Sequence, residues 1–282
     1  MKEKAVFKSE KGRDEILAVY DTLLKRWPVP YNTREIATRC GNTFALTCGD
    51  PAAAPLVLLH GSTSNSAMWI GDSVVYSRHF RVIALDIPGE PGKSAPVRTA
   101  LAGPGYVDWM EDVFSALGLE KAALEGISLG GWLALKFAAA HPERVSRLVL
   151  LCPAGVVTQK MSFLLAAIAL SPFGGWGRER LVRRVYGRQT VVREAVAYSK
   201  LIGAHFNPRM EVIPLFSGEE LRRLDMPVLL IAGEKDALLP SKKTAARLES
   251  LLPRLTVHLL PGSGHVILDQ AGSVADFLTA SE

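Results

Sequence analysis

Short apolar runs alternate with longer helical patterns along most of the chain. The apolar runs cover residues 55–60, 81–86, 122–126, 147–152, 227–233 and 256–260, and the helical patterns cover 104–118, 129–141, 241–252 and 265–280. Such runs are typical of strands buried on both faces, and the helices between them predict crossover connections. We therefore expect an α/β fold with a mainly parallel central sheet and helices on both of its faces.

Two stretches depart from this alternation. An amphipathic helix is predicted over 12–27, followed by a hairpin over 35–48 with Gly41-Asn42 as its turn. Residues 155–225 carry helical patterns but no strand run, which predicts a helical cap inserted before the strand at 227–232 and placed over the carboxyl edge of the sheet. We expect three regions, namely an N-terminal helical extension at 1–34, a core at 35–154 and 226–282, and a cap at 155–225.

Composition narrows the class of protein. The 282 residues (30.6 kDa) are 48% hydrophobic and 22% charged, which is typical of a globular protein. The net charge of +5 is too small and scattered to indicate nucleic acid as a partner. Three cysteines without metal-ligand spacing, and a start without an apolar signal core, favour a cytoplasmic protein with reduced thiols and no bound metal. The longest apolar run, 163–170, is too short to insert stably across a membrane.

The strongest chemical signal is Gly126-Ile-Ser128-Leu-Gly130, which follows a predicted strand and opens a predicted helix. A side chain at so tight a turn needs small neighbours two positions away on each side, and both are glycine. The helix that follows directs its free N–H groups toward the turn. Ser128 is therefore the candidate nucleophile.

A serine hydroxyl needs a neighbouring base to accept its proton. Of the six histidines, His265 follows the last strand in the glycine-rich loop Pro261-Gly-Ser-Gly264. This loop lies at the same carboxyl edge of the sheet as Ser128. His265 is therefore the candidate base.

The base in turn needs a carboxylate that holds its tautomer and stabilises the imidazolium. Asp236 lies in the loop after the strand 227–232, and Glu234 in the same loop is the reserve. Asp269 is expected in the first turn of the closing helix, where the helix dipole favours its charge. The order Ser128, Asp236, His265 is typical of one particular fold.

Acyl transfer also needs N–H donors for the developing oxyanion. The N–H of Leu129, directly after the nucleophile, is one candidate. Gly61 allows the loop after the strand 55–60 to turn in closely, so the N–H of Ser62 is the second candidate, with Thr63 in reserve. No cofactor is expected, because water and the substrate complete this chemistry.

His60-Gly61, the Ser128 turn, the Asp236 loop and Gly264-His265 together resemble the α/β-hydrolase family over residues 35–282. The Leu-Lys-Arg-Trp-Pro segment at 24–28, with the helix before it, is more narrowly similar to bacterial carboxylesterases of the naproxen-ester-cleaving type. The resemblance implies Ser128 as nucleophile, His265 as base, Asp236 as acid and a helical cap.

Two departures from the family pattern are visible. The turn Asp86-Ile-Pro-Gly-Glu-Pro-Gly-Lys-Ser94 is one residue longer than the family's usual Asp-x-x-Gly-x-Gly-x-Ser, so the shape of this wall of the site differs. Glu125 stands where an apolar residue is commoner, and because burial would require a partner for its carboxyl group, we expect a backbone or basic group beside it.

The cap carries bulky apolar residues and a row of arginines. Residues 161–170 are apolar nearly all round, which predicts burial, either against the sheet or as the lining of a substrate pocket. The candidate substrate-binding residues are Met161, Leu165, Phe173, Trp176 and Phe206. Arg180, Arg184 and Arg188 recur at helical spacing, which favours a solvated outer face, the alternative being attraction of anionic substrates or of an acidic surface.

We therefore expect a serine hydrolase, a carboxylesterase that cleaves small hydrophobic esters through an acyl-enzyme, with the ester and water as its substrates. Hydrolysis of another acyl bond (lactone, amide, thioester or carbon–carbon) and cofactor-free perhydrolysis remain open, because all share this site. A non-catalytic ligand-binding protein is the remote alternative, since binding alone has no need of the three side chains.

Overall fold

A single sheet forms the centre of the molecule. The computed structural model describes residues 5–190 and 192–281, except the side chains of residues 161, 164, 167, 171 and 178. Over these residues, eight strands pair in the order β1-β2-β4-β3-β5-β6-β7-β8. They are β1 (Tyr31–Thr38), β2 (Gly41–Cys48), β3 (Pro55–Leu59), β4 (Arg81–Leu85), β5 (Ala122–Ile127), β6 (Val145–Leu151), β7 (Val228–Gly233) and β8 (Leu255–Leu260). Only β2 runs antiparallel to its neighbours, so the predicted fold class is confirmed.

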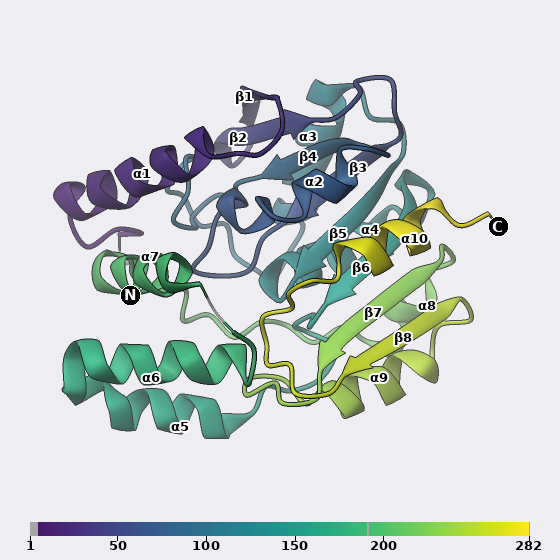
Figure 1. Cartoon of the computed structure of the whole chain (residues 1–282). Helices are drawn as coiled ribbons and strands as arrows, with labels where there is room; N and C mark the ends of the chain where they lie inside the picture. The colour runs from purple at the N-terminus through teal and green to yellow at the C-terminus, as the bar shows by residue number, and fades with distance from the viewer. Residues whose placement is uncertain (1–4, 191, 282) are drawn as a thin grey trace.

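Helices cover both faces of the sheet (Figure 1). They are α1 (Glu10–Lys25), α2 (Ser73–Tyr76), α3 (Gly105–Leu117), α4 (Leu129–Ala140), α5 (Met161–Leu170), α6 (Gly174–Tyr186), α7 (Arg193–His205), α8 (Gly218–Arg222), α9 (Ser241–Glu249) and α10 (Ala271–Thr279), with single 3-10 turns η1 (Ser66–Trp69), η2 (Pro142–Arg144) and η3 (Ser171–Phe173). In Figure 1, α2 and α10 lie together in front of the sheet, and α3 and α4 lie behind it.

The strands form where the sequence is apolar on both sides because both sides are covered. Every residue of β5 and β7 is buried, as is each residue of β3 after Pro55. Helix α4 is apolar nearly all round because it packs on β3, β5 and β6 as well as on α3 and α8. The core therefore lies directly beneath the turn that joins β5 to α4.

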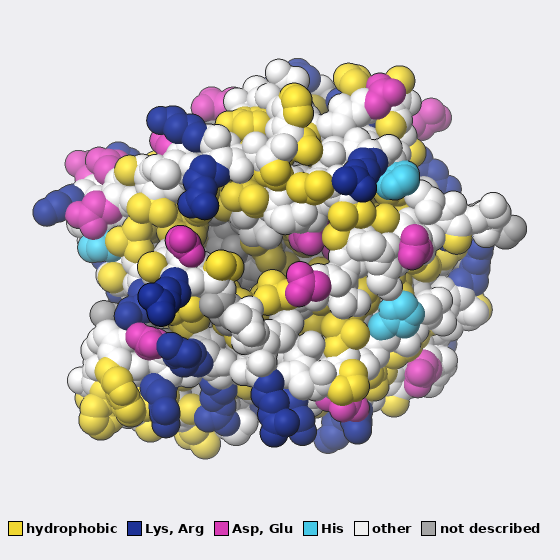
Figure 2. Space-filling model, in the orientation of Figure 1, with side chains coloured by type: hydrophobic (Ala, Val, Ile, Leu, Met, Phe, Trp, Pro, Cys, Tyr) yellow, Lys and Arg dark blue, Asp and Glu magenta, His cyan; other side chains and the backbone are white. Residues whose placement is uncertain are grey.

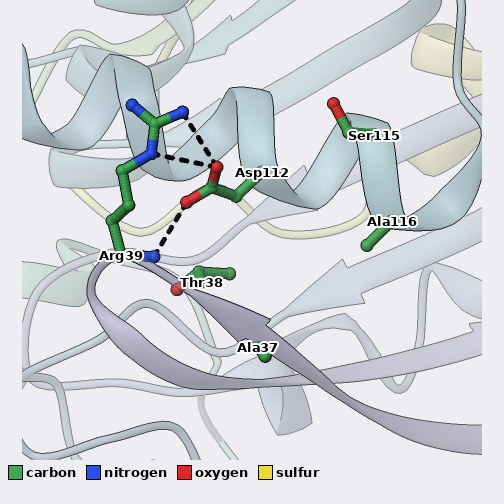
Figure 3. A pocket seen from close by; sticks show the side chains of 6 residues that line it. All are labelled: Ala37, Thr38, Arg39, Asp112, Ser115 and Ala116. Carbon is green, nitrogen blue, oxygen red and sulfur yellow. Dashed lines mark hydrogen bonds and ion pairs between the residues drawn. The ribbon is translucent and has the colours of Figure 1, made fainter.

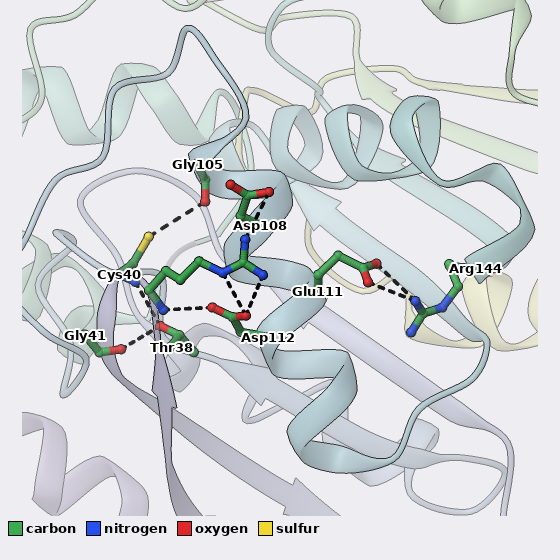
Figure 4. Close-up of polar contacts among 9 residues, drawn as sticks. Thr38, Cys40, Gly41, Gly105, Asp108, Glu111, Asp112 and Arg144 are labelled. Carbon is green, nitrogen blue, oxygen red and sulfur yellow. Dashed lines mark hydrogen bonds and ion pairs between the residues drawn. The ribbon is translucent and has the colours of Figure 1, made fainter.

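The hairpin turn differs from the prediction. It consists of Arg39 and Cys40, while Gly41, with φ +85°, already begins β2. The Arg39 N–H donates to the Asp112 carboxylate on α3 at 2.8 Å, and the Arg39 guanidinium pairs with the same carboxylate at 3.0 Å (Figure 4). This tertiary anchor, which local sequence does not encode, places the turn two residues earlier than expected.

The closing helix also differs from the prediction, because α10 begins at Ala271 and not at residue 265. Asp269 lies before the helix with φ +57°, so it is not part of the first helical turn as expected. The apolar spacing of Val266, Ile267 and Leu268 imitates a helix, but these residues belong to the loop that carries His265. His265 therefore lies on a loop that precedes α10.

Helices α5 to α8 lie between β6 and β7, where the cap was predicted. The N-terminal segment binds this region directly: Val6 and Ile16 pack with Ile202 and Phe206, and the Lys8 N–H donates to the carbonyl of His205 at 2.8 Å. None of the described helices has both the length and the apolar character needed to cross a membrane.

Candidate active site

Ser128 lies in a strained turn between β5 and α4. Its φ of +54° and ψ of −109° are rare for a residue with a side chain. A Cβ atom at Gly126 would lie 2.3 Å from the carbonyl oxygen of Gly130, and one at Gly130 would lie 2.1 Å from that of Leu59. Both glycines are therefore required by close backbone contacts. The Ser128 N–H donates to the carbonyl of Leu151 at 2.9 Å, which ties the turn to β6.

The predicted base and acid are joined by a hydrogen bond. His265 Nδ1 lies 2.8 Å from Asp236 Oδ2, and both residues are buried, with exposures of 6% and 1%. Asp236 Oδ1 accepts the N–H groups of Leu238 and Leu239 at 2.7 and 2.9 Å. Burial by itself raises the pKa of Asp236, but the hydrogen bonds from His265 and these amides outweigh it and hold that pKa below its ordinary value. Asp236 is therefore an anion that orients the imidazole.

The reserve acid Glu234 lies outside this arrangement. Its side chain is exposed and pairs with Lys242 at 3.3 Å. Asp269 interacts with a different carboxyl group, that of Asp72, whose pKa is raised by the negative charge of Asp269. Of the three carboxylates considered from sequence, Asp236 is the one hydrogen-bonded to His265.

A buried histidine shapes the loop that carries the predicted oxyanion donor. His60 Nε2 accepts the N–H of Ile87 at 2.9 Å, so the proton is on Nδ1, which donates to the carbonyl of Gly61 at 2.8 Å. Burial lowers the pKa of His60, so the ring is neutral at pH 7. His60 thus bends the backbone just before Ser62.

The next residue, Thr63, has φ +58°, and its N–H donates to Glu90 Oε2 at 2.7 Å. That N–H is therefore engaged, which leaves Ser62 as the donor candidate in this loop. Leu129 is the first residue of α4, so its N–H has no acceptor within the helix. Glu90 is 1% exposed, and burial raises its pKa to about 7 despite the hydrogen bond from Thr63 and the charges of Arg98 and Arg209.

Sequence reasoning missed Glu90, and it also missed Cys152. Cys152 follows β6 with φ +43°, and its buried Sγ lies within 4.8 Å of ligand atoms of Asp236 and His265. Sulfur, carboxylate and imidazole are groups that hold metals, but here Asp236 Oδ2 and His265 Nδ1 are engaged with each other in a hydrogen bond. Burial, and then the charge of Asp236, raise the pKa of the Cys152 thiol well above its ordinary value.

The strand order brings these groups to one edge. Ser128, Cys152, Asp236 and His265 follow β5, β6, β7 and β8, which are consecutive neighbours running in parallel. The cap contacts the same edge: the His265 N–H donates to the carbonyl of Val185, near the end of α6, at 2.7 Å. In the orientation of Figure 1, the surface is hollowed beside α7, with hydrophobic side chains around the hollow (Figure 2).

The predicted substrate-binding residues are not gathered into one pocket among the side chains that the structure describes. Leu165, Phe173 and Trp176 are 62%, 60% and 57% exposed, and Phe206 is fully buried against the N-terminal segment. Met161 begins α5, but its side chain lies outside the described part. The expected burial of residues 161–170 is also corrected, because α5 packs mainly on α6 and none of its described side chains is buried.

The partner of the buried Glu125 is a hydroxyl group, and not the backbone or basic group that was expected. The Tyr76 hydroxyl donates to Glu125 Oε1 at 3.1 Å, while Oε2 has no partner among the described atoms. Burial, and then the charge of Asp72, raise the pKa of Glu125 well above its ordinary value. Burial and then the charge of Asp269 raise the pKa of Asp72 to about 7.

A separate surface hollow of about 630 Å³ lies between the hairpin turn and α3 (Figure 3). The charged residues of its lining are Arg39 and Asp112, which pair and neutralise each other. Three strands separate β1 from β5 in the sheet, so the hollow is remote from Ser128. The chemistry therefore points to the carboxyl edge and not to this hollow.

Comparison with known proteins agrees with this geometry. Residues 56–277 match the model of the alpha/beta hydrolase family. Carboxylesterase YbfK from Bacillus subtilis is 30% identical over 257 residues, which cover 88% of this chain and 86% of the relative. A second Bacillus subtilis carboxylesterase, nap, is 31% identical and covers 88% and 85%.

Solved structures give the same picture. The crystal structure of carboxylesterase CesB (YbfK) from Bacillus subtilis superposes with a TM-score of 0.87 at 29% identity, covering 96% of this chain and all of that one. The naproxen esterase of Bacillus subtilis superposes with a TM-score of 0.86 at 28% identity, covering 96% and 98%. The narrower resemblance seen in the sequence is therefore confirmed.

Proposed function

The chain belongs to the alpha/beta hydrolase family, and from this premise we propose that it is a carboxylesterase that forms an acyl-enzyme on Ser128. The observation that carries the proposal is the hydrogen bond between His265 Nδ1 and Asp236 Oδ2, at the same sheet edge as the strained Ser128 turn. Carboxylesterases with similar chains support the reaction type.

The hydrogen bond supports different roles for the two ring nitrogens. Because Nδ1 of His265 donates to Asp236, Nε2 is the nitrogen that accepts the Ser128 hydroxyl proton as Oγ attacks the ester carbonyl. The N–H groups of Leu129 and Ser62 stabilise the oxyanion of the tetrahedral intermediate. The proton then passes from Nε2 to the leaving alcohol, and a water molecule, activated by the same nitrogen, releases the acid and restores Ser128.

The substrate class we propose is the small ester of a hydrophobic carboxylic acid. Support comes from the naproxen esterase among the structural neighbours and from the hydrophobic side chains around the hollow beside α7. We further propose a cytoplasmic location, which three free, buried cysteines support.

Labelling with a fluorophosphonate tests the nucleophile. We expect one covalent adduct per chain, located on Ser128, and no adduct on Ser128→Ala. A wild-type chain that stays unlabelled would favour a non-catalytic, ligand-binding role. An undiminished adduct on Ser128→Ala would place the nucleophile elsewhere.

The acid is tested by comparing Asp236→Asn with Glu234→Gln, a neighbouring carboxylate that pairs with Lys242 instead. We expect Asp236→Asn to lower kcat roughly 10⁴-fold because the tautomer of His265 is no longer held. Glu234→Gln should stay near the wild-type rate. The opposite ranking would overturn the assignment of Asp236.

Relatives that cleave carbon–carbon bonds share the fold, since 2-hydroxymuconate semialdehyde hydrolase from a Pseudomonas species is 29% identical over 252 residues. A panel of p-nitrophenyl esters of increasing acyl length, assayed beside lactones, amides and vinylogous diketones, ranks the alternatives. We expect the esters to be cleaved fastest. Slow ester cleavage together with rapid turnover of a diketone would replace the proposal.

A further inference from the structure

An exposed apolar surface lies at the outer end of the hairpin formed by α5 and α6. Leu165 and Ile168, one helical turn apart on α5, are each 62% exposed, and Phe173 and Trp176 are 60% and 57% exposed. The rings of Phe173 and Trp176 contact edge to face, with 5.6 Å between centroids. We call these four side chains the hairpin tip. Soluble proteins rarely expose so many large apolar side chains together without a partner.

Arginines adjoin the hairpin tip. The Arg180 guanidinium stacks 5.3 Å from the ring centre of Trp176, and Arg183 and Arg184 continue along α6, all exposed. Residues 161–190 contain five arginines and one acidic residue, Glu179. Arg183 and Lys200 pair with Glu179 at 2.9 and 3.1 Å, so the single negative charge is neutralised within the cap. Figure 2 shows hydrophobic side chains at the end of the hairpin and a row of Lys and Arg beside them.

We propose that the hairpin tip and the adjoining arginines form a docking surface for an anionic phospholipid membrane. Apolar side chains with a Trp at their edge, bordered by cations, match a bilayer surface, where acyl chains lie beneath negatively charged headgroups. The charge favours this occupant over a second copy of the chain, because two such arginine rows would repel each other. The interaction is peripheral, since none of the described helices can span the membrane.

The position on α6 argues against a role as pocket lining. Trp176 lies in the first turn of α6, whereas Val185, which accepts the His265 N–H, lies in its last turn. At 1.5 Å per residue, these positions are about 13 Å apart along the helix axis. The hairpin tip is thus at the end of the cap away from the His265 loop, where docking leaves the catalytic edge uncovered.

Sedimentation of the whole protein with lipid vesicles tests the proposal. We expect binding to vesicles of equal parts phosphatidylglycerol and phosphatidylcholine, and much weaker binding to phosphatidylcholine alone. Binding should weaken as salt rises from ~0.1 M to ~1 M, because the screening length falls from about 10 Å to about 3 Å. Trp176→Ser and Leu165→Ser should each weaken it about tenfold. Arg180→Gln and Arg184→Gln should each weaken it about fivefold.

Two control variants carry the same types of substitution outside the hairpin tip and its arginines. They are Val212→Ser, at a residue that is 86% exposed, and Arg34→Gln, at an exposed position of β1. Both should bind vesicles like the wild type, and circular dichroism should report the same fold for all variants. Equal binding to both kinds of vesicle, absence of binding, or equal effects of the controls would overturn the proposal. A dimer that forms without lipid and dissociates in Trp176→Ser would assign the hairpin tip to self-association instead.

Discussion

Two buried carboxyl groups beside the Ser62 loop have opposite surroundings. Asp86 accepts hydrogen bonds from the Tyr20 hydroxyl, from the N–H and hydroxyl of Ser66, and from the N–H of Lys93. Glu90 accepts the Thr63 N–H through Oε2, while its Oε1 lacks a partner among the described atoms. A buried carboxylate with incomplete partners is held less firmly in its charged form, so the charge of Glu90 depends on pH near neutrality.

This difference predicts how stability varies with pH. The pKa of Glu90 is about 7 in the folded protein, above its ordinary value of 4.5. Between these values the folded state binds more protons, so the free energy of unfolding falls as pH rises. The gap corresponds to at most roughly 3 kcal/mol. In Glu90→Gln this contribution disappears, so the variant should gain stability relative to wild type from pH 4.5 to 7.5, as measured by urea unfolding. The exposed Glu120→Gln should show no such trend. If the free energy of unfolding of Glu90→Gln varied with pH in parallel with that of the wild type, the raised pKa of Glu90 would be contradicted.

Cys152 leads to a second prediction at the same scale. Burial and the nearby Asp236 charge raise the pKa of its thiol, and thiolate is the reactive form. In a chain with Cys40→Ser and Cys48→Ser, iodoacetamide at pH 8 should alkylate Cys152 at least ~10-fold more slowly than an exposed thiol, since each rise of one in pKa reduces thiolate tenfold. Ser115→Cys provides that exposed thiol on α3. Equal rates in the folded protein would show that Cys152 is accessible and ionised.

The sequence predicted Ser128, His265 and Asp236 because each follows a recognisable strand in a loop with its own signature. It did not predict Glu90 or Cys152, because their roles depend on neighbours distant in the chain. The contact between Glu90 and Thr63 joins residues 27 apart, and Cys152 meets Asp236 only through the pairing of β6 with β7. Residues of this kind carry no local motif.

At the scale of elements, β3 to β8 were located to within about two residues because their sequences are short apolar runs, whereas β1, which is mostly exposed, begins at Tyr31, four residues before the predicted hairpin. Elements that depend on tertiary contacts were missed. Short η1 and α2, which contain Trp69 and Tyr76 as buried anchors, are too brief to show a helical period. The closing helix was extended over the loop of His265 because that loop is apolar where it packs against the core.

The turn between β5 and α4 gives a prediction with a matched control. In Gly130→Ala the added Cβ would lie 2.1 Å from the Leu59 carbonyl, so α4 must move away from β3. We expect a loss of roughly 1–3 kcal/mol or more in stability, together with loss of activity. In Gly272→Ala, on the exposed side of α10 with no atom within 4 Å, stability should rise by roughly 0.5–1 kcal/mol. Thermal unfolding and an ester assay measure both. A neutral Gly130→Ala would contradict the close approach.

At the scale of the whole molecule, the cap is held to the core from the N-terminal side. Phe206 is fully buried, with Phe7 edge to face at 6.0 Å and the Arg98 guanidinium 5.3 Å from its ring centre. The same segment is bound through its backbone, where Asn207 N–H donates to Val6. The packing of α1 on α7 therefore links the first residues of the chain to the cap.

Phe206→Ala should weaken this link locally. Removing a buried phenylalanine typically costs about 3–5 kcal/mol, and here the loss falls on the contact between α1 and α7. Hydrogen exchange should accelerate in α7 while β5 keeps its protection. Phe173→Ala, at a side chain 60% exposed, should leave both unchanged. If hydrogen exchange accelerated equally in α7 and across the sheet, the contact between α1 and α7 would belong to the same cooperative unit as the core.

The same link has a consequence for synthesis on the ribosome. Lys8 Nζ donates to the carbonyl of Gly203, 195 residues later in the chain. At about 5–20 residues per second, the partner of α1 emerges roughly 10–40 s after α1 itself. During that interval Ile16, which later packs against Phe206, has no native neighbour from α7. The nascent N-terminal helix therefore exposes part of its apolar face until α7 has been translated.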